Sequence, residues 1–315
     1  MSRAFVFPGQ GSQAVGMGKA LGESFAEARA VYEEVDAALG ASLSRLMFEG
    51  PEAELTLTAN AQPALMAVSL AAVRVLEAHA GLDLARDVAF VAGHSLGEYS
   101  ALATASALTV ADTARLLRLR GQAMQAAVPV GEGAMAALLG VELDAAREIA
   151  EAAAHAEGAV CQAANDNGGG QIVVSGAKAA VDRAIAIAKE RGVKRALLLP
   201  VSAPFHCALM QPAADAMREA LATAAIRPPR VPVVANVTAR PTTDPEEIRR
   251  LLVEQVTGTV RWRESVAYIA EQGVTKFVEC GAGKVLTGLL KRIVPEAAGT
   301  AVGAPADLEA YRAFV

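Results

Sequence analysis

The sequence predicts an α/β fold with a mostly parallel sheet and one small inserted domain. Short apolar runs that end in Gly, Pro or Asn alternate with long helical stretches along the 315 residues. This alternation is typical of parallel strands buried between two layers of helices. Between residues 130 and 198 the expected order changes to β-α-β-β-α-β, which is the signature of a ferredoxin-like unit.

The elements of the large domain are predicted from the period of the apolar residues and from the residues that interrupt it. The expected strands are Arg3–Phe7, which runs into Pro8-Gly9, Val88–Ala92 before Gly93, Val231–Ala235 before Asn236, and Lys276–Val278 before Cys280-Gly281. The expected amphipathic helices include Ser24–Leu39, Pro63–Ala80 and Glu246–Gln255. In such a sheet the functional groups gather at the carboxyl ends of the strands.

The inserted domain is predicted from six shorter segments. In chain order they are the strand Gly133–Gly140, the helix Asp144–Ala156, the strands Ala159–Ala164 and Gln171–Ser175, the helix Ala179–Gly192 and the strand Lys194–Leu199. The turn-forming run Asn165–Gly170 predicts a hairpin between the two central strands. We therefore expect a large domain of residues 1–129 and 199–315 and an inserted domain of residues 130–198.

Composition narrows the class of function. The chain is 53% hydrophobic and 20% charged with a net charge of -5, which indicates a globular protein and argues against a nucleic-acid binder. Its three cysteines and four histidines lack C-x-x-C and H-E-x-x-H spacing, so we expect neither a disulfide framework nor a metal site. The first strand begins too close to Met1 for a signal peptide, and no uncharged apolar run is long enough to span a membrane. We expect a cytoplasmic protein without a membrane partner.

The segment Gly93–Gly97 fits the pattern G-x-S-x-G. In this pattern the serine lies at a sharp turn between a strand and a helix, with its Oγ exposed above the sheet. The glycines are needed because a Cβ would crowd the turn. The strand before Gly93 and the helix-compatible run Gly97–Ala107 provide this context, so Ser95 is predicted to be the nucleophile of an α/β-hydrolase-like core. The Leu96 N–H, at the helix N-terminus, is a natural donor to an oxyanion.

A serine nucleophile needs a base within hydrogen-bonding distance. We predict His206, because it lies in a loop after a strand and follows Ser95 in the chain, as the histidine of α/β hydrolases does. His94 is the rival, but neighbours at a turn usually diverge, and we interpret it as a structural or access-gating residue. No acidic residue at a strand end lies between Ser95 and His206. We therefore expect a backbone carbonyl to orient the imidazole, unlike in an ordinary hydrolase.

Arg120 is predicted to point into the core. In the helix that follows the expected N-cap Thr109, a rotation of ~100° per residue places Arg120 within the apolar stripe and Arg115 and Arg118 on the opposite face. A buried guanidinium without an anion costs several kcal/mol. Its partner is either an internal carboxylate such as Glu98 or a substrate carboxylate held bidentately, and the residues alone leave this choice open.

Several motifs in order along almost the whole chain resemble those of the malonyl-CoA:acyl-carrier-protein transacylases. They are Phe7–Gln13, Gly93–Ser100, Met124–Pro129, Pro204–Met210 and Gly281–Gly288. The resemblance implies Ser95 as nucleophile, His206 as base and Arg120 as the clamp for a malonyl carboxylate. It also implies that the backbone N–H groups of Gln10 and Leu96 form the oxyanion hole, and that the main-chain carbonyl of Gln255 orients the histidine.

The activity that the resemblance implies is the transfer of a malonyl group from malonyl-CoA to the phosphopantetheine thiol of an acyl carrier protein, through a malonyl-serine intermediate. This reaction supplies fatty-acid synthesis. The alternatives are a malonyl transferase of polyketide synthesis, a serine thioesterase or esterase, and a non-catalytic subunit that binds carrier proteins. Malonyl-CoA is a substrate and no cofactor is implied. The expected partners are the carrier protein and CoA, and the expected state is a monomer.

Overall fold

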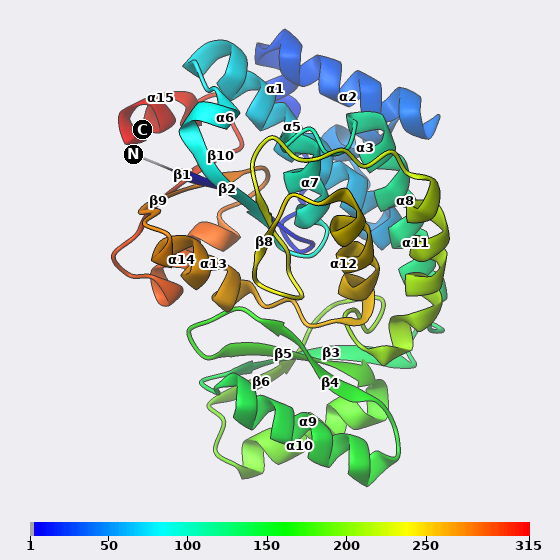
Figure 1. Cartoon of the computed structure of the whole chain (residues 1–315). Coiled ribbons are helices and arrows are strands. Elements are labelled where there is room, and N and C mark those ends of the chain that lie inside the picture. Colours follow the sequence, from blue (N-terminus) through cyan, green and yellow to red (C-terminus); the bar gives the residue numbers. More distant parts are fainter. Residues whose placement is uncertain (1–2) are drawn as a thin grey trace.

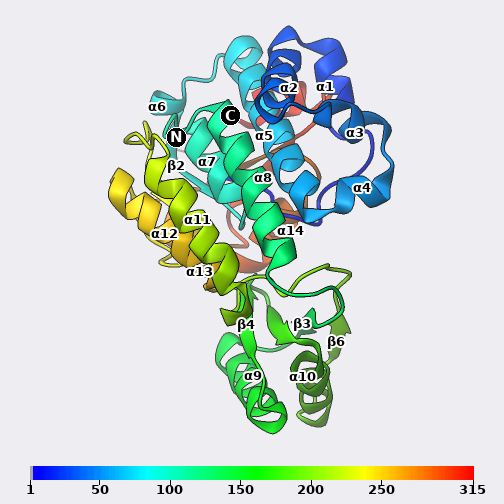
Figure 2. The ribbon, with the colours of Figure 1, turned by 90° about the vertical axis from the view of Figure 1, so that its right-hand side faces the viewer.

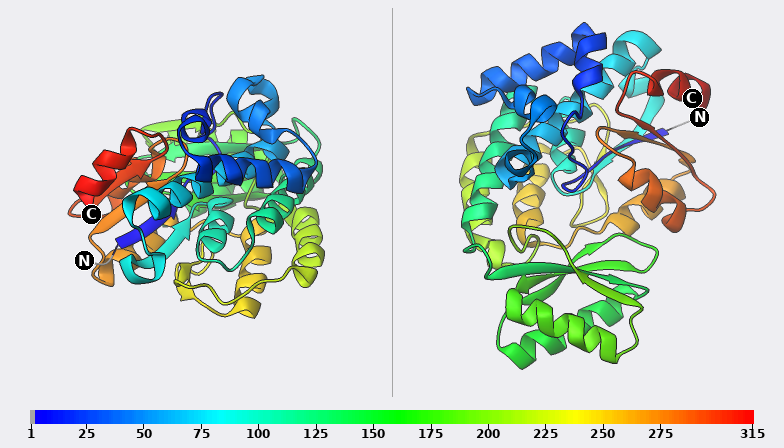
Figure 3. Two further views of the ribbon diagram at one scale, coloured as in Figure 1. Left: turned by 90° about the horizontal axis from the view of Figure 1, so that it is seen from above. Right: turned by 180° about the vertical axis from the view of Figure 1, so that it is seen from behind.

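The computed structural model describes residues 3–315, whose elements form a larger and a smaller unit (Figure 1). Met1 and Ser2, where the large domain was predicted to begin, lie outside the described residues. The smaller unit lies at one end of the molecule, and the same arrangement is seen after a quarter turn (Figure 2). The two ends of the described chain lie side by side in the larger unit (Figure 3).

The larger unit is built on a six-stranded sheet with the order β10-β9-β1-β2-β7-β8. The strands are β1 (Arg3–Phe7), β2 (Val88–Gly93), β7 (Val233–Val234), β8 (Pro241–Thr242), β9 (Lys276–Cys280) and β10 (Ala298–Val302). All neighbours are parallel except β7 and β8, so the predicted mostly parallel sheet is confirmed. The strand expected at Val231–Ala235 is reduced to the two residues of β7.

Side chains of these strands are buried alternately on the two faces of the sheet, as the two-residue period of a strand requires. Phe5 and Phe7 of β1 pack into a core with the helices α5 (Thr58–Ala80), α7 (Gly97–Thr104) and α8 (Val110–Ala126). Ala4 and Val6 face the opposite core, formed with α13 (Trp262–Glu271) and α14 (Val285–Ile293). The other helices of this unit are α1 (Lys19–Ser24), α2 (Ala26–Leu39), α3 (Leu43–Glu49), α4 (Glu52–Thr56), α6 (Leu84–Asp87), α11 (Gln211–Thr223), α12 (Pro245–Thr257) and α15 (Asp307–Phe314), with a 3-10 turn at Ala208–Met210.

Helix α5 is a central helix of the core. The sequence predicted an amphipathic helix over Pro63–Ala80, but α5 begins at Thr58 and is buried on nearly all sides because α2, α7 and α8 surround it. Within residues 3–315 it is the one helix whose length and composition would suffice to cross a membrane. Of its most apolar 18-residue window, 72% is buried inside the protein.

The smaller unit contains an antiparallel sheet with the order β4-β5-β3-β6. Its elements are β3 (Gly133–Leu139), α9 (Leu143–Glu157), β4 (Cys161–Asp166), β5 (Gln171–Ala177), α10 (Lys178–Glu190) and β6 (Arg195–Leu198). The predicted order β-α-β-β-α-β is thus present. Because β4 extends to Asp166, the hairpin turn is shorter than the expected Asn165–Gly170.

The two faces of this smaller sheet have different neighbours. Helices α9 and α10 cover the face turned away from the larger unit (Figures 1 and 3), and Ala136 and Leu138 of β3 pack against them. The intervening residues Met135 and Ala137 point the other way and line the cleft between the units. The smaller unit therefore forms one wall of the candidate site.

Candidate active site

Residues that follow the carboxyl ends of the parallel strands lie in or near one cleft, as expected for an α/β sheet. Gln10 follows β1, Ser95 follows β2, Asn236 follows β7 and the turn at residues 281–284 follows β9. The cleft encloses about 590 Å³ and is lined by residues of both units. It contains all the predicted site residues except Gln255, which is fully buried next to it.

Ser95 occupies a strained turn between β2 and α7, with φ = 53°. A Cβ on Gly93 would lie 1.9 Å from the carbonyl carbon and oxygen of Gly97, and a Cβ on Gly97 would lie 2.2 Å from the Phe7 oxygen. Neither glycine can therefore carry a side chain without moving the backbone. The Ser95 N–H donates to the Asn236 side-chain oxygen at 2.8 Å, a brace that the sequence did not predict.

The side chains of Ser95 and His206 are hydrogen-bonded, with 2.8 Å between Oγ and Nε2. The other ring nitrogen, Nδ1, lies 2.8 Å from the main-chain carbonyl oxygen of Gln255. A carbonyl only accepts hydrogen bonds, so Nδ1 carries the proton and Nε2 is free to accept the Ser95 hydroxyl proton. The backbone carbonyl expected in place of a carboxylate is therefore in position.

Electrostatics keep His206 neutral. Burial, followed by the positive charge of Arg120, lowers the pKa of His206 to about 3. The imidazole is thus in the form that can accept a proton at neutral pH. Its pKa nevertheless lies well below neutral pH, and a general base is most efficient when its pKa is near the working pH.

Arg120 of α8 points into the site, as the helical periodicity predicted, and is only 1% exposed. Its Nη1 donates to the Gln62 side-chain oxygen at 2.8 Å, and its Nη2 donates to the Gln255 side-chain oxygen at 2.8 Å and to Ser95 Oγ at 3.1 Å. No carboxylate of residues 3–315 forms a salt bridge with it. Glu98 is therefore not its ion-pair partner, and the choice left open by the sequence is settled against an internal carboxylate.

The other arginines of α8 differ in their surroundings. Arg115 is exposed and pairs with Asp112, as predicted for a solvated side chain. Arg118 was also predicted to be solvated but is only partly exposed, because it donates a hydrogen bond to the Asn60 side chain. Thr109 caps the helix by accepting from the Asp112 N–H at 3.0 Å.

A buried polar network lies beneath the serine turn. Glu98, in the first turn of α7, is 3% exposed, and its Oε2 accepts from the Asn236 N–H and from the Gln255 side-chain amide, both at 2.9 Å. Burial raises the pKa of Glu98 to about 7. The side chains of Gln62, Glu98 and Asn236 were not assigned to the site from the sequence. Asn236 directly follows an expected strand, and that position is the signal that would have identified it.

The backbone N–H groups of Gln10 and Leu96, which line the cleft, have no acceptor within residues 3–315. Leu96 immediately precedes α7, so its N–H belongs to the unpaired amides of a helix N-terminus. The Gln10 side chain, by contrast, donates to Thr58 Oγ1 at 3.1 Å. Both amides are available to an oxygen bound in the cleft.

His94 makes its side-chain contacts with residues other than Ser95. Its Nε2 lies 2.8 Å from the Asn167 side-chain oxygen in the hairpin of the smaller unit. Its ring centroid lies 5.7 Å from that of Trp262. The predicted divergence of neighbours at the turn is therefore observed, and His94 connects the two units.

The comparisons with known proteins agree with this geometry. A model of the acyl transferase domain matches residues 4–306. The malonyl CoA-acyl carrier protein transacylase of Bacillus subtilis (strain 168) is 46% identical over 306 residues, which cover 97% of this chain and 95% of the relative. The chain belongs to the malonyl CoA-acyl carrier protein transacylase family. The resemblance predicted from the motifs is thereby confirmed.

Solved structures of this transacylase family superpose on nearly the whole chain. The acyl-carrier-protein S-malonyltransferase of Bartonella henselae is 58% identical with a TM-score of 0.96, covering 99% of this chain and 98% of the other. A malonyl-transacylase in complex with its type II PKS acyl-carrier protein is 43% identical with a TM-score of 0.94, covering 98% of each chain.

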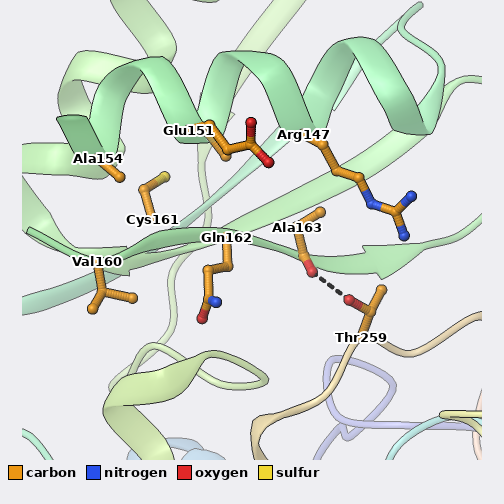
Figure 4. Close-up of a pocket in the computed structure, with 9 residues that line it drawn as sticks. Arg147, Glu151, Ala154, Val160, Cys161, Gln162, Ala163 and Thr259 are labelled. Atoms are coloured by element: carbon orange, nitrogen blue, oxygen red, sulfur yellow. Dashed lines mark hydrogen bonds between the residues drawn. The ribbon is translucent and has the colours of Figure 1, made fainter. Parts of the chain in front are cut away.

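This transacylase has a second cavity, of about 460 Å³, between α9 and β4 of the smaller unit (Figure 4). Arg147 and Glu151 line it from α9, and Thr259 lines it from the larger unit and donates to the Ala163 carbonyl at 2.7 Å. Its thiol, Cys161, is buried, and burial raises the pKa of Cys161 to about 12. This thiol is therefore protonated at neutral pH, whereas Ser95, His206 and the unpaired N–H groups of Gln10 and Leu96 all lie at the first cleft.

Proposed function

We propose that this protein transfers a malonyl group from malonyl-CoA to the phosphopantetheine thiol of an acyl carrier protein, and thereby supplies extender units for fatty-acid synthesis. The deciding observation is the buried Arg120 guanidinium, which has no acidic partner within residues 3–315 and lies 3.1 Å from Ser95 Oγ. A carboxylate on the acyl group is the anion that such a cation would bind. The named relatives support the same activity.

In the first half of the reaction, malonyl-CoA binds with its free carboxylate on Arg120 and its thioester oxygen towards the N–H groups of Gln10 and Leu96. His206 takes the Ser95 proton as Oγ attacks the thioester carbon. The negative charge that develops on the oxygen is stabilised by the two amides, each of which typically contributes about 10²–10³ in rate. The C–S bond then breaks, and His206 returns the proton to the departing sulfur.

In the second half, the carrier thiol enters the cleft vacated by CoA. His206 takes the thiol proton, the sulfur attacks the malonyl ester, and the proton passes back to Ser95 Oγ as the C–O bond breaks. The malonyl carboxylate remains on Arg120 throughout. The same groups therefore serve both halves, with Gln255 orienting His206 through its main-chain carbonyl.

The substrate carboxylate also affects the base. Arg120 is the second cause of the lowered pKa of His206, after burial. A carboxylate bound to Arg120 offsets its positive charge, so the pKa of His206 rises towards the range in which a general base is efficient. A neutral acyl group brings no such charge. The malonyl carboxylate thus favours the reaction in two ways: it strengthens binding to Arg120, and it makes His206 a better base.

The proposal extends to the architecture and setting. We assign residues 1–129 and 199–315 to an α/β-hydrolase-like domain and residues 130–198 to a ferredoxin-like insertion, supported by the strand order β4-β5-β3-β6. The reaction requires no cofactor, because side chains and backbone amides supply the nucleophile, base, clamp and oxyanion donors. We propose a cytoplasmic monomer whose partners are the acyl carrier protein, malonyl-CoA and CoA, with no nucleic-acid or membrane partner.

Intact-mass measurement tests the proposal. Wild-type protein mixed with malonyl-CoA, without an acceptor thiol, should gain one malonyl group, and the Ser95→Ala variant should gain none. Addition of pantetheine should discharge the adduct as malonyl-pantetheine. Rapid release of free malonate without a thiol would instead indicate a thioesterase, and carrier binding without any adduct would indicate a non-catalytic subunit.

A further inference from the structure

Glu98 is a buried carboxylate for which the transfer mechanism has no direct use. It is 3% exposed, and it forms no salt bridge with any arginine or lysine of residues 3–315, including Arg120. A buried carboxylate is costly unless its oxygens accept hydrogen bonds. The groups that donate to Glu98 are therefore the key to what it does.

Both donors to Glu98 belong to residues that hold the site. The Asn236 N–H donates to its Oε2 at 2.9 Å, and the Asn236 side chain in turn accepts from the Ser95 N–H and donates to the Gly93 carbonyl at 2.7 Å. The Gln255 side-chain nitrogen donates to the same Oε2 at 2.9 Å. Glu98 thus joins the brace of the serine turn to the residue that contacts Arg120.

The direction of the Gln255 amide follows from these contacts. Its nitrogen lies 2.9 Å from Glu98 Oε2 and 3.0 Å from the Ser95 carbonyl oxygen, and its oxygen accepts from Arg120 Nη2 at 2.8 Å. In the flipped orientation the amide oxygen would face two acceptors, and the amide NH₂ would face a cationic donor. Glu98 and the Ser95 carbonyl therefore select the orientation that presents an oxygen to Arg120.

We propose that Glu98 is a positioning residue for malonyl selection: its carboxylate fixes the Gln255 amide, and the fixed amide holds Arg120 where the substrate carboxylate binds. This inference rests on the proposed malonyl transfer. Gln255 lies between the Glu98 carboxyl group and the Arg120 guanidinium, so Arg120 is held by neutral amide oxygens and keeps its charge for the substrate. The route runs through the side chain of Gln255 and leaves its main-chain carbonyl, which holds His206, in place.

The ratio of malonyl to acetyl transfer tests the proposed role of Glu98, because a residue that only stabilises the fold would not change this ratio. Partial unfolding lowers transfer of malonyl and acetyl groups alike, whereas misplacement of Arg120 affects only the group that carries a carboxylate. We expect Glu98→Met, which keeps the side-chain length but removes the acceptor, to lower the malonyl-over-acetyl ratio of kcat/KM about tenfold or more, as for loss of a hydrogen bond to a charged group. Glu98→Gln should retain the ratio, because its amide oxygen can accept from the same two donors.

Glu279 provides a matched control. It is fully buried, and it accepts from the Leu286 N–H at 3.0 Å and from the Thr287 N–H at 2.7 Å at the start of α14, without a hydrogen bond to Gln255 or Arg120. Glu279→Met should lower both activities and leave the ratio unchanged. If Glu98→Met does not fold, Glu98→Asp, which withdraws the carboxylate by one methylene, should lower the ratio instead.

The possible outcomes separate this inference from the proposed function. No malonyl adduct on wild-type protein would overturn the function itself. An active wild type with an unchanged ratio in the folded Glu98→Met or Glu98→Asp variant would overturn only the role of Glu98. A ratio that falls equally in Glu279→Met, or in Glu98→Gln, would also overturn it, because neither variant removes the acceptor on which the argument depends.

Discussion

Replacement of Arg120 by Met is the most direct perturbation of the site. Methionine is unbranched and uncharged but shorter, so the variant removes the cation while keeping the packing of the aliphatic part of the side chain. The wild-type guanidinium is 1% exposed and donates only to neutral oxygens, those of Gln62, Gln255 and Ser95. Because no internal ion pair is broken, although the Gln62 and Gln255 oxygens lose a donor, we expect Arg120→Met to remain folded, with a free energy of unfolding within about 3 kcal/mol of that of the wild type.

The expected loss of activity follows from the charge that the variant leaves without a partner. Removal of one member of a buried ion pair typically costs about 3–5 kcal/mol, and each 1.36 kcal/mol is a factor of ten in rate. We therefore expect kcat/KM for malonyl-CoA to fall by about 10²–10⁴-fold. Acetyl transfer should be unchanged or faster, because an acetyl group makes no use of the cation and the smaller positive potential makes His206 a stronger base.

The assay is the rate at which Ser95 is acylated, measured with malonyl-CoA and with acetyl-CoA at equal concentrations. Arg118→Met is the matched control, because Arg118 lies two residues away on the same helix and donates to Asn60 outside the cleft. It should leave the malonyl preference intact. If Arg120→Met kept the wild-type preference for malonyl, the guanidinium could not be the clamp, and the reasoning from its position would be refuted.

Three further predictions concern stability. His206 has its folded pKa lowered to about 3 from 6.5, so its contribution to stability is present above pH 6.5 and is lost as pH falls, by up to about 1.4 kcal/mol per unit. The free energy of unfolding of His206→Gln, relative to that of the wild type, should therefore be higher at pH 5 than at pH 7. Glu98 has its folded pKa raised to about 7 from 4.5, so its contribution to stability is present below pH 4.5 and is lost as pH rises through 7. The free energy of unfolding of Glu98→Gln, relative to that of the wild type, should therefore increase between pH 5 and pH 8. Denaturant titrations at each pH check both signs, and a reversed order would contradict the assigned charge states. Gly93→Ala should fail to fold or lose the malonyl adduct, because its Cβ would lie 1.9 Å from the Gly97 backbone. The control is Gly288→Ala in α14, where an added Cβ has no neighbouring atom within 4 Å. Thermal unfolding should show this variant to be as stable as the wild type or up to about 1 kcal/mol more stable.

Much of the fold could be predicted because its strands and long helices have strong local patterns. The strands β1, β2 and β9 and the six elements of the smaller unit were predicted within a few residues of their bounds. Elements without such a pattern were missed: β8 has two residues, β10 is an Ala-Gly-Thr run without large apolar side chains, and α4 and α6 are single turns. Their conformation depends on the strands and helices against which they pack.

The residues of the candidate site likewise divide into those with a local sequence signal and those without one. Ser95 and Arg120 were identified from local signals: two flanking glycines in one case, and a charge within an apolar stripe in the other. Gln255 was identified only from the family resemblance, because its contacts to His206 and Arg120 join residues 49 and 135 positions apart. Gln62 lies 58 positions from Arg120, and nothing in its own neighbourhood indicates that contact. Long-range polar pairs of this kind follow from the assembled fold.

The way Arg120 is held is consistent with the proposed site, which must both tolerate a buried cation and discriminate between substrates. A carboxylate partner would neutralise the charge and compete with the substrate, whereas a cation without any partner would destabilise the fold. The side-chain amides of Gln62 and Gln255 avoid both problems, because they accept hydrogen bonds from the guanidinium without neutralising its charge. The Nε of Arg120 has no acceptor in the described chain. In the proposed binding mode, a substrate carboxylate supplies the negative charge that these neutral amides lack, and a neutral acyl group supplies none. We therefore expect malonyl selectivity to depend on Gln62 and Gln255 as well as on the arginine. An acidic residue at either position should remove the preference while leaving the Ser95–His206 pair intact.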